Sequence, residues 1–433
     1  MKEKISSYFE LEQLNTNMKR EMLAGFTTFI SMAYILFVNP TVLGASGMDE
    51  GAVFTATALA SALGCILMGV LAKYPIATAP ALGINAFFAY SVSVGMGIPW
   101  QTTLAGVFVA SLIFILITIF KLRELIIDAI PADLKFAISG GIGLFIAFLG
   151  LSQGGLIVAN DATLVGLGPL NVGSTWVTIV GLVVTAILLV RRVPGGIFIG
   201  MAISTIVGLA TGVIPMPDKI ISSAPSLEPT FLVALGHVKD INTIQMWVVV
   251  LTFLLVTFFD TAGTLVGLAN QAGFMKDNKM PRVGKALAAD STAMLAGSLL
   301  GTSPVGAYVE SSAGIAVGGR SGITAITTGI LFIFSLLFSP LLAVVTSQVT
   351  APALIIVGVL MAQSLSKIKW NEMEIAIPSF LILLTYSISD GIALGFIFYP
   401  ITMIAAKRGK EVSPIMYGLF FVFVGFMWIL NAQ

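Results

Sequence analysis

Charged residues are scarce in this sequence. Only 10% of its 433 residues are Asp, Glu, Lys or Arg, whereas 57% are hydrophobic. A soluble domain carries about 25% charged residues, so most of this chain's outer surface faces something other than water. Runs of about 20 apolar residues, each long enough to cross a hydrocarbon layer of about 30 Å, recur along the chain. They predict an all-α protein that crosses the membrane many times.

Other absences exclude several classes of protein. The single cysteine, Cys65, lies inside an apolar run, so no disulfide framework is expected. The single histidine, His237, falls in a predicted loop, so no imidazole can relay protons within the membrane. No phosphate-binding loop, HExxH motif or nucleophile elbow is present, which argues against ATP drive and against an enzyme. We expect no cofactor, no metal and no nucleic acid partner.

We predict fourteen membrane spans. The polar segment 1–22 lacks the apolar core of a secretory signal, so we expect the first span to remain in the mature chain. Residues 23–213 and 245–406 hold seven spans each. Residues 407–433 hold a basic cluster and an apolar stretch, 414–430, that either crosses again or lies along the surface. The spans lie near 23–43, 51–72, 76–93, 101–120, 134–151, 174–190, 196–213, 246–268, 284–300, 304–319, 323–345, 352–366, 373–388 and 390–406.

The positions of Lys and Arg support this layout. Basic loops stay on the cytoplasmic side of a membrane. With the N-terminus inside, only two of the 22 Lys and Arg residues, Lys219 and Lys239, fall outside, both in the loop 214–244. The pattern predicts a multi-pass protein of the plasma membrane with a cytoplasmic N-terminus and an extracellular loop at 214–244.

The two halves contain an internal repeat. ATAPALGINAFFAY (77–90) in the third span is similar to GTSPVGAYVESSAGI (301–315) in the tenth. Pro131 and Pro352, which we expect to open the fifth and twelfth spans, are separated by nearly the same offset as Pro80 and Pro304 in the two repeated segments. Seven spans separate equivalent elements, and an odd number inverts the second half relative to the first. Inverted repeats of this kind are typical of secondary transporters.

The third and tenth spans each contain a proline at membrane depth, Pro80 and Pro304. Proline lacks an N–H group and favours extended backbone in the residue before it. We therefore expect each segment to enter as a short strand and continue as a half-helix. The alternative, a pair of ordinary proline kinks, is disfavoured because the two prolines match. Broken elements at equivalent places in both halves indicate a substrate site.

Four acidic residues lie within or near spans, and no lysine or arginine lies deep in any span. A carboxyl group inside the membrane is costly and indicates a functional site. Low polarity disfavours the charged form, so such a group can bind and release a proton. Asp290 follows Lys285 closely and either has a function or lies at the membrane surface, whereas Asp390 is expected to cap a helix. The four acids are Asp260, Asp290, Glu310 and Asp390.

Asp260 and Glu310 are the main candidates for substrate binding and proton coupling. Asp260 lies near the middle of its span, where bonding to a broken backbone is the alternative role. Glu310 begins the half-helix after Pro304, where free N–H groups and the positive end of the helix dipole favour anions. A capping role for Glu310 is compatible with ligand binding. Asn85 is its counterpart in the first half, and its amide both donates and accepts hydrogen bonds.

Over essentially its whole length the sequence resembles the second nucleobase–cation symporter family, in its AzgA-like purine branch. The segments that carry the resemblance are TAPALGINAFFAY, FFDTAGTLVG, TSPVGAYVESSAGIAVGGRSG and YSISDGIALGF. The resemblance implies two inverted repeats of seven spans, with spans 3 and 10 broken. It also implies a core domain of spans 1–4 and 8–11, a gate domain of spans 5–7 and 12–14, elevator-like movement and a possible homodimer.

The resemblance further implies how a purine base is held. Thr264 stands where uracil-type members carry a histidine, four residues after the eighth-span acid, which leaves Asp260 and Glu310 as the proton carriers. The xanthine- and urate-type signature of the wider family is also absent from the tenth span, and both departures favour hypoxanthine, guanine or adenine over uracil or xanthine. Phe87, Phe88 and Phe259 are candidates for flanking the ring. The substrate-binding residues that it implies are Asn85, Asp260, Glu310, Tyr308, Val309, Gly83 and Thr264.

The sequence therefore predicts proton-coupled uptake of purine nucleobases, with hypoxanthine and guanine as the preferred substrates. An adenine permease of the same branch is one alternative. Sodium in place of the proton is another. The same fold also serves anion transporters and channels, but an acid at Glu310 argues against an anion as the substrate.

Overall fold

The computed structural model describes residues 2–120, 130–217, 219–275, 280–384 and 388–431. Four of the basic residues used to orient the chain lie outside these ranges, and so do the first two residues of YSISDGIALGF. They are Lys121, Arg123, Lys276, Lys279, Tyr386 and Ser387.

Nine helices in the described ranges are long and apolar enough to cross a membrane, and four shorter apolar helices accompany them. Fourteen segments result when the nine are joined by the helix Val283–Leu300, by two of the shorter helices, Gly196–Ala210 and Met373–Leu384, and by the two broken segments described below. Of the other two shorter helices, Leu82–Gly95 belongs to the third segment and the last one follows at the C-terminal end. The first half contains α2 (Met18–Met32), α3 (Ile35–Gly44), α4 (Glu50–Leu67) with η1 (Met68–Ala72), α6 (Trp100–Ile119), α8 (Ala132–Gln153), α9 (Gly173–Val190) and α10 (Gly196–Ala210). The second half contains α12 (Ile244–Gln271), α13 (Val283–Leu300), α15 (Gly322–Ser335) with η4 (Leu336–Val344), α16 (Ser347–Ala362) with η5 (Gln363–Lys367), α17 (Met373–Leu384), α18 (Ile388–Ala405) and α19 (Pro414–Asn431).

The third and tenth segments are broken as the prolines predict. The third consists of β1 (Thr78–Pro80), α5 (Leu82–Ala86) and η2 (Phe87–Gly95), and the tenth consists of β4 (Val305–Ala307) and α14 (Ser311–Ala316). β1 and β4 pair in antiparallel fashion. Backbone hydrogen bonds of 2.9 and 3.0 Å, from Tyr308 to Ala77 and from Ala81 to Pro304, extend the ladder beyond both strands. Each broken segment thus satisfies the backbone groups that the other leaves open, which membrane depth demands.

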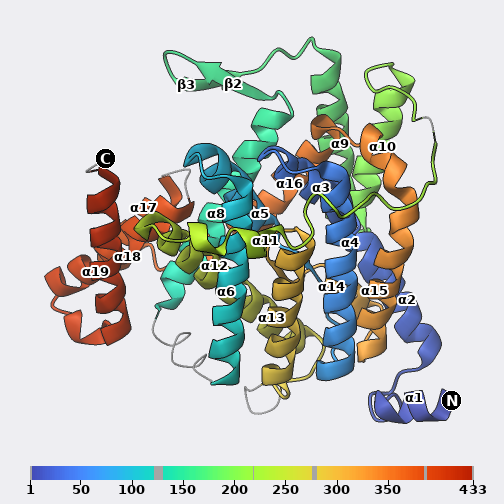
Figure 1. The fold of residues 1–433 in the computed structure, drawn as a ribbon, viewed down its shortest axis with the longest axis horizontal. Helices are drawn as coiled ribbons and strands as arrows, with labels where there is room; N and C mark the ends of the chain where they lie inside the picture. Colours follow the sequence, from blue (N-terminus) through green and yellow to red (C-terminus); the bar gives the residue numbers. More distant parts are fainter. Residues whose placement is uncertain (1, 121–129, 218, 276–279, 385–387, 432–433) are drawn as a thin grey trace.

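The helices pack in two groups. In one, α15 packs on α2 and α4, and α13 packs on α4 and α6 around the β1–β4 pair; in the other, α16 packs on α8 and α9, and α17 packs on α8 and α18 (Figure 1). These groups correspond to spans 1–4 with 8–11 and to spans 5–7 with 12–14; we call them the core and the gate. Glycines allow close contact inside the gate, since a Cβ on Gly143 would lie 2.7 Å from the carbonyl oxygen of Gly358.

The prediction that Pro352 opens the twelfth span is wrong. α16 begins at Ser347, and Pro352 lies inside it. A proline in a helix leaves the carbonyl four residues earlier without its usual donor. Here that carbonyl belongs to Gln348, and the Thr178 hydroxyl of α9 donates to it at 3.0 Å. The helix therefore continues through the proline because a neighbouring helix supplies the missing hydrogen bond. Pro131, by contrast, directly precedes α8 as predicted.

The same arrangement recurs in α17. Pro378 lies inside the helix, and the carbonyl that it frees is that of Glu374. The Thr402 hydroxyl of α18 donates to this carbonyl at 2.7 Å. Threonines on adjacent helices thus stabilise two proline-containing helices of the gate.

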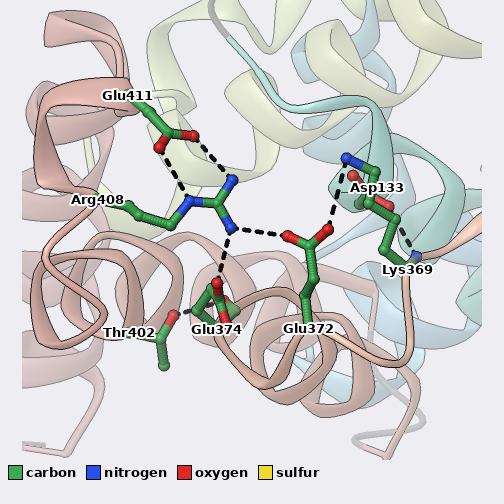
Figure 2. A network of polar contacts seen from close by, with 7 residues as sticks. All are labelled: Asp133, Lys369, Glu372, Glu374, Thr402, Arg408 and Glu411. Atoms are coloured by element: carbon green, nitrogen blue, oxygen red, sulfur yellow. Dashed lines mark hydrogen bonds and ion pairs between the residues drawn. The ribbon is translucent and has the colours of Figure 1, made fainter.

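The basic cluster after α18 is partly neutralised. Figure 2 shows the Arg408 guanidinium, shortly after the end of α18, contacting two carboxylates at the start of α17 and one in η6 (Gly409–Glu411). The Lys369 backbone amide donates to Asp133, in the first turn of α8, at 3.0 Å. These contacts gather the ends of four gate elements on one side of the molecule. The three carboxylates lie 2.7, 2.7 and 2.8 Å from Arg408 and belong to Glu372, Glu374 and Glu411.

The N-terminal segment is bound to the core at one end of the helices. α1 (Lys2–Tyr8) lies there, opposite the end from which the unpredicted hairpin of β2 (Ile157–Asn160) and β3 (Leu164–Leu167) projects (Figure 1). Glu10 follows α1, and its carboxylate lies 2.9 Å from the Lys73 ammonium and 3.8 Å from Arg282. The hydrogen bond from Lys73 holds the pKa of Glu10 below its usual value.

The long loop between the halves is attached to the opposite end of the core. The Thr55 hydroxyl of α4 donates to the Pro225 carbonyl at 2.9 Å, and the Leu232 amide donates to Leu299 of α13 at 2.7 Å. The loop contains two short helices, α11 (Val233–Gly236) and η3 (Val238–Asp240). It is therefore a strap across the core rather than a free connection.

Candidate functional site

Asp260 and Glu310 come together beside the paired strands. Asp260 lies on α12, near the middle of the helix, and Glu310 immediately precedes α14. α12 packs against both β4 and α14, which brings the two acids to the same region. Both side chains are partly exposed, although most residues around them are buried. The two acids therefore keep part of their surface uncovered at the level where the chain is broken.

Two tyrosines hold this region in place. Tyr34, in the turn between α2 and α3, is fully buried, and its hydroxyl donates to Oε1 of Glu310. The Tyr308 hydroxyl donates to the Pro80 carbonyl at 3.0 Å and thereby ties the tenth segment to the third. Val309, between Tyr308 and Glu310, is 57% exposed, and its carbonyl accepts a hydrogen bond from the Ser312 amide at 3.0 Å. One oxygen of Glu310 is thus occupied by a fixed donor, and the other can serve a ligand.

Asn85 lies on α5 and is fully buried. Its Nδ2 donates to Oδ1 of Asn39 at 2.9 Å, and Nδ2 of Asn39 donates to Thr302, just before β4, at 2.8 Å. The Oδ1 atom of Asn85 has no hydrogen-bond partner among the described residues. Asn39 therefore links the two broken segments and leaves one acceptor of the Asn85 amide available.

Gly83 and Thr264 take different positions. Gly83 faces the gate, because a Cβ there would lie 2.3 Å from Cγ2 of Ile142 on α8. Thr264 is one turn after Asp260 on α12 and is partly exposed. A Cβ on Gly263 or Gly267 would meet no atom within 4 Å among the described residues. This face of α12, on the C-terminal side of Asp260, therefore borders open space.

Asp290, which the sequence placed either in a functional role or at the membrane surface, is fully buried within the protein. The Thr261 hydroxyl of α12 donates to Oδ2 of Asp290 at 2.9 Å. The charges of Asp290 and Asp260 are also close enough to interact. Asp290 consequently belongs to the same acidic cluster. Asp390 lies in the first turn of α18, where a capping acid is expected.

The three candidate phenylalanines separate into two kinds. Phe87 and Phe88 are buried and pack against Phe253, with ring centroids 5.1 and 6.3 Å away, so their environment is that of core packing. Phe259 is partly exposed next to Asp260. The Lys135 ammonium, from the first turn of α8, lies 5.5 Å from the centroid of the Phe259 ring. A gate cation therefore approaches the residue beside the α12 acid.

A fifth acid near the spans, Glu21, was missed because it precedes the predicted start of the first span. It is fully buried in the first turn of α2. Its carboxylate accepts hydrogen bonds from the backbone amides of Arg320 and Ser321 at 2.9 and 3.0 Å, and from the Thr324 hydroxyl at 2.6 Å. All of these donors lie at the turn that joins α14 to α15, so Glu21 fixes the far end of the broken segment.

Tyr34 and Asn39 were also missed. A polar residue beside a proline inside an apolar span, as in Asn39–Pro40, is the signal that could have indicated Asn39. No comparable signal marks Tyr34. Within the described ranges, no three or more His, Cys, Asp and Glu side chains are grouped to hold a metal ion.

A separate cavity between α8, α17 and α18 is small and lined mostly by apolar side chains. It holds about 10 Å³ and is lined by side chains such as Ile138, Phe145, Ile382 and Ile392. Ligand sites combine apolar walls with a few convergent polar groups. The acids, the amide and the paired strands are therefore the candidate site.

Paired broken segments, inverted halves and acids at the break define a membrane transporter rather than an enzyme. Residues 19–405 match the Permease family, and the chain belongs to this family. It is 56% identical to the guanine/hypoxanthine permease PbuG of Bacillus subtilis, over 97% of this chain and 98% of that protein. It is 40% identical to the adenine permease AdeP of Escherichia coli, over 96% of this chain and 94% of that protein.

The fold is also found in a solved transporter structure. The transmembrane domain of the cyanobacterial bicarbonate transporter BicA superimposes with a TM-score of 0.62 at 14% identity, covering 90% of this chain and 97% of that domain. The two-repeat, seven-span fold and the resemblance to the purine branch are thus confirmed. The chain is a multi-pass membrane protein.

Proposed function

We propose that this permease takes up purine bases, hypoxanthine and guanine in particular, across the plasma membrane together with protons. The observation that carries the proposal is the meeting of Asp260 and Glu310 where the two broken segments pair. Within the described part of the chain, neither carboxylate takes part in an ion pair. The relative named for guanine and hypoxanthine, at 56% identity over nearly the whole chain, supports the substrate class.

The chemistry of the site suits a flat, neutral base that is rich in N–H groups. A carboxylate can accept hydrogen bonds from N1–H and the amino group of guanine, or from N1–H of hypoxanthine. Glu310 keeps one oxygen for such a contact because Tyr34 occupies the other. Val309 and Tyr308 would supply an apolar side chain and an aromatic wall, Asn85 would supply an amide, and the remaining wall would include Thr264.

Proton coupling follows from the same acids. A carboxyl group in surroundings of low polarity binds a proton readily and releases it when water or an opposite charge approaches. Binding of the base and protonation at Asp260 or Glu310 would then favour movement of the core against the gate, with Gly83 at the sliding contact. Sodium is the alternative coupling ion, because carboxylate and carbonyl oxygens also bind it.

The orientation belongs to the proposal as well. The segment 1–22 and the ends joined by Arg408 would face the cytoplasm, and the strap 214–244 would face outwards. The clustering of basic residues at one end of the helices supports this assignment.

An adenine permease is the second candidate, and the 40% identity to AdeP favours it less than the 56% identity to PbuG favours guanine and hypoxanthine. Transport of an anion has only the fold in its favour, and Glu310 would repel an anion at the half-helix.

Uptake of labelled hypoxanthine, guanine, adenine, uracil and sulfate by cells that lack their own permeases tests the proposal. We expect uptake of hypoxanthine and guanine that a protonophore abolishes and that does not need sodium. Asp260→Asn and Glu310→Gln should each abolish accumulation although the protein reaches the membrane. Asp161→Asn and Glu228→Gln, the same substitutions at exposed loop positions, are the matched controls. Full accumulation by either site variant would remove that residue from the site.

A further inference from the structure

The Asn39 side chain uses its entire hydrogen-bonding capacity. It is fully buried in α3. Its Nδ2 donates to Thr57 and to Thr302, both at 2.8 Å. Its Oδ1 accepts from Asn85 at 2.9 Å and from Ser303 at 3.2 Å. An amide offers two donors and an oxygen with two lone pairs, so nothing remains for a ligand. Asn39 acts on the site only through its neighbours.

Thr57 decides which way the Asn39 amide points. The Thr57 hydroxyl, on α4, donates its one hydrogen to the Val53 carbonyl at 2.7 Å. With its hydrogen on Val53 it accepts from Asn39, and the group facing it is the NH₂ of Asn39. A flipped Asn39 would place its oxygen against the Thr57 oxygen, and the Thr57 hydroxyl would have to give up its bond to Val53 to avoid the repulsion of two buried acceptors.

The orientation of Asn39 in turn orients Asn85. Because Oδ1 of Asn39 faces Asn85, the group that Asn85 turns towards it must be NH₂. The remaining atom of the Asn85 amide is Oδ1, which is buried and has no partner among the described residues. A buried acceptor without a donor is unfavourable, so a ligand that brings an N–H group to this oxygen gains affinity.

We infer that Thr57 and Asn39 form a hydrogen-bond relay that fixes Asn85 as an acceptor and thereby selects bases that present an N–H group to it. Thr57 and Asn39 are positioning residues in this inference, and Asn85 is the residue that touches the base. The inference rests on the proposed function. It adds the residues that set the donor–acceptor pattern of the site.

Hypoxanthine and adenine are suitable probes, because they exchange donor and acceptor on the six-membered ring. Hypoxanthine has N1–H and a C6 carbonyl, whereas adenine has a bare N1 and a C6 amino group. 7-Methyl- and 9-methylhypoxanthine remove the N–H group from the imidazole edge. The panel therefore reports a reversed Asn85 amide whichever edge of the base it reads.

Thr57→Val removes the hydroxyl with little change of shape, and Thr57→Ser keeps it and is the matched control. The Val53 carbonyl keeps its helical backbone partner in both variants. Competition against labelled hypoxanthine uptake gives an inhibition constant for each probe, expressed relative to hypoxanthine. Without the relay both amides can reverse, so we expect at least one ratio to change about fivefold or more in Thr57→Val, the effect of one hydrogen bond. Thr57→Ser should match the wild type.

A purely structural role for Thr57 would lower the uptake rate of all bases without changing the ratios. Unchanged ratios in Thr57→Val would overturn the inference while the proposed function stands. Absence of purine uptake by the wild type would instead reject the proposed function. If Thr57→Val does not reach the membrane, Thr57→Ala removes the same hydrogen bond and is judged by the same ratios.

Discussion

The contact between Tyr34 and Glu310 leads to a quantitative prediction for ligand affinity. Tyr34 is fully buried, and its hydroxyl donates to one oxygen of Glu310. We expect the hydroxyl to hold the carboxylate in the position from which its other oxygen meets the base. Tyr34→Phe removes the donor and keeps the ring, and Glu310→Gln removes the charge and keeps the shape.

The size of each effect follows from this geometry. Glu310→Gln loses one charge-assisted hydrogen bond to the base, which is worth about 1.5–3 kcal/mol and corresponds to roughly a ten- to hundredfold weaker affinity. Tyr34→Phe frees one side chain that the ligand must then immobilise, at about 0.5–1.5 kcal/mol, or roughly a two- to twelvefold loss. In the double variant, the tyrosine change should add almost nothing, because Tyr34 acts through the carboxylate.

Equilibrium binding of labelled hypoxanthine to the purified protein in detergent, at one pH, measures the affinities of the wild type, the two single variants and the double variant. The coupling energy between the two positions is the difference between the double variant and the sum of the single ones. We expect it to equal nearly the whole effect of Tyr34→Phe. Fully additive losses would refute the reasoning, since Tyr34 would then act independently of Glu310.

Three further predictions concern the framework. Thr178→Val should lower the free energy of unfolding by about 1 kcal/mol, because the carbonyl freed by the proline in α16 loses its donor. Thermal unfolding in detergent measures the loss. Thr205→Val is the control, because the Thr205 hydroxyl is bonded within its own helix. Gly83→Ala should reduce the uptake rate severalfold because its methyl group would meet α8 at 2.3 Å, whereas Gly418→Ala, with no atom within 4 Å among the described residues, should not. The pKa of Glu10 is lower in the folded protein than in the unfolded chain, where it is about 4.5. Its bond to Lys73 therefore stabilises the fold above about pH 4.5, and this contribution is lost as the pH falls. Glu10→Gln should therefore unfold slightly earlier than the wild type at pH 7, by less than about 1 kcal/mol, and the difference should vanish near pH 3.

The elements that the sequence predicted well are those set by local chemistry. Pro80 and Pro304 forbid a continuous helix, so the breaks and the short strands follow from residue type alone. The apolar length of each run and the positions of the basic residues define the spans. Pro352 misled the prediction because the residue that permits it, Thr178, lies on another helix.

The features that the sequence did not reveal depend on contacts between distant segments. Asn39 matters because its amide reaches Asn85 and Thr302, which are far away along the chain. Asp290 was ambiguous because its distance from Lys285 in sequence says nothing about which face of α13 it occupies. Tyr34 is one of several aromatic residues in apolar spans, and only the packed structure brings it to Glu310.

The pairing of β1 with β4 also has a consequence for biosynthesis. The ladder joins backbone groups from the third and tenth segments, so β1 has no partner while only the first half of the chain has entered the membrane. Its amides and carbonyls must stay solvated, or remain shielded by the insertion machinery, until Val305 arrives. The first half alone would leave that strand open, so β1 reaches its paired state only after the second half has been made.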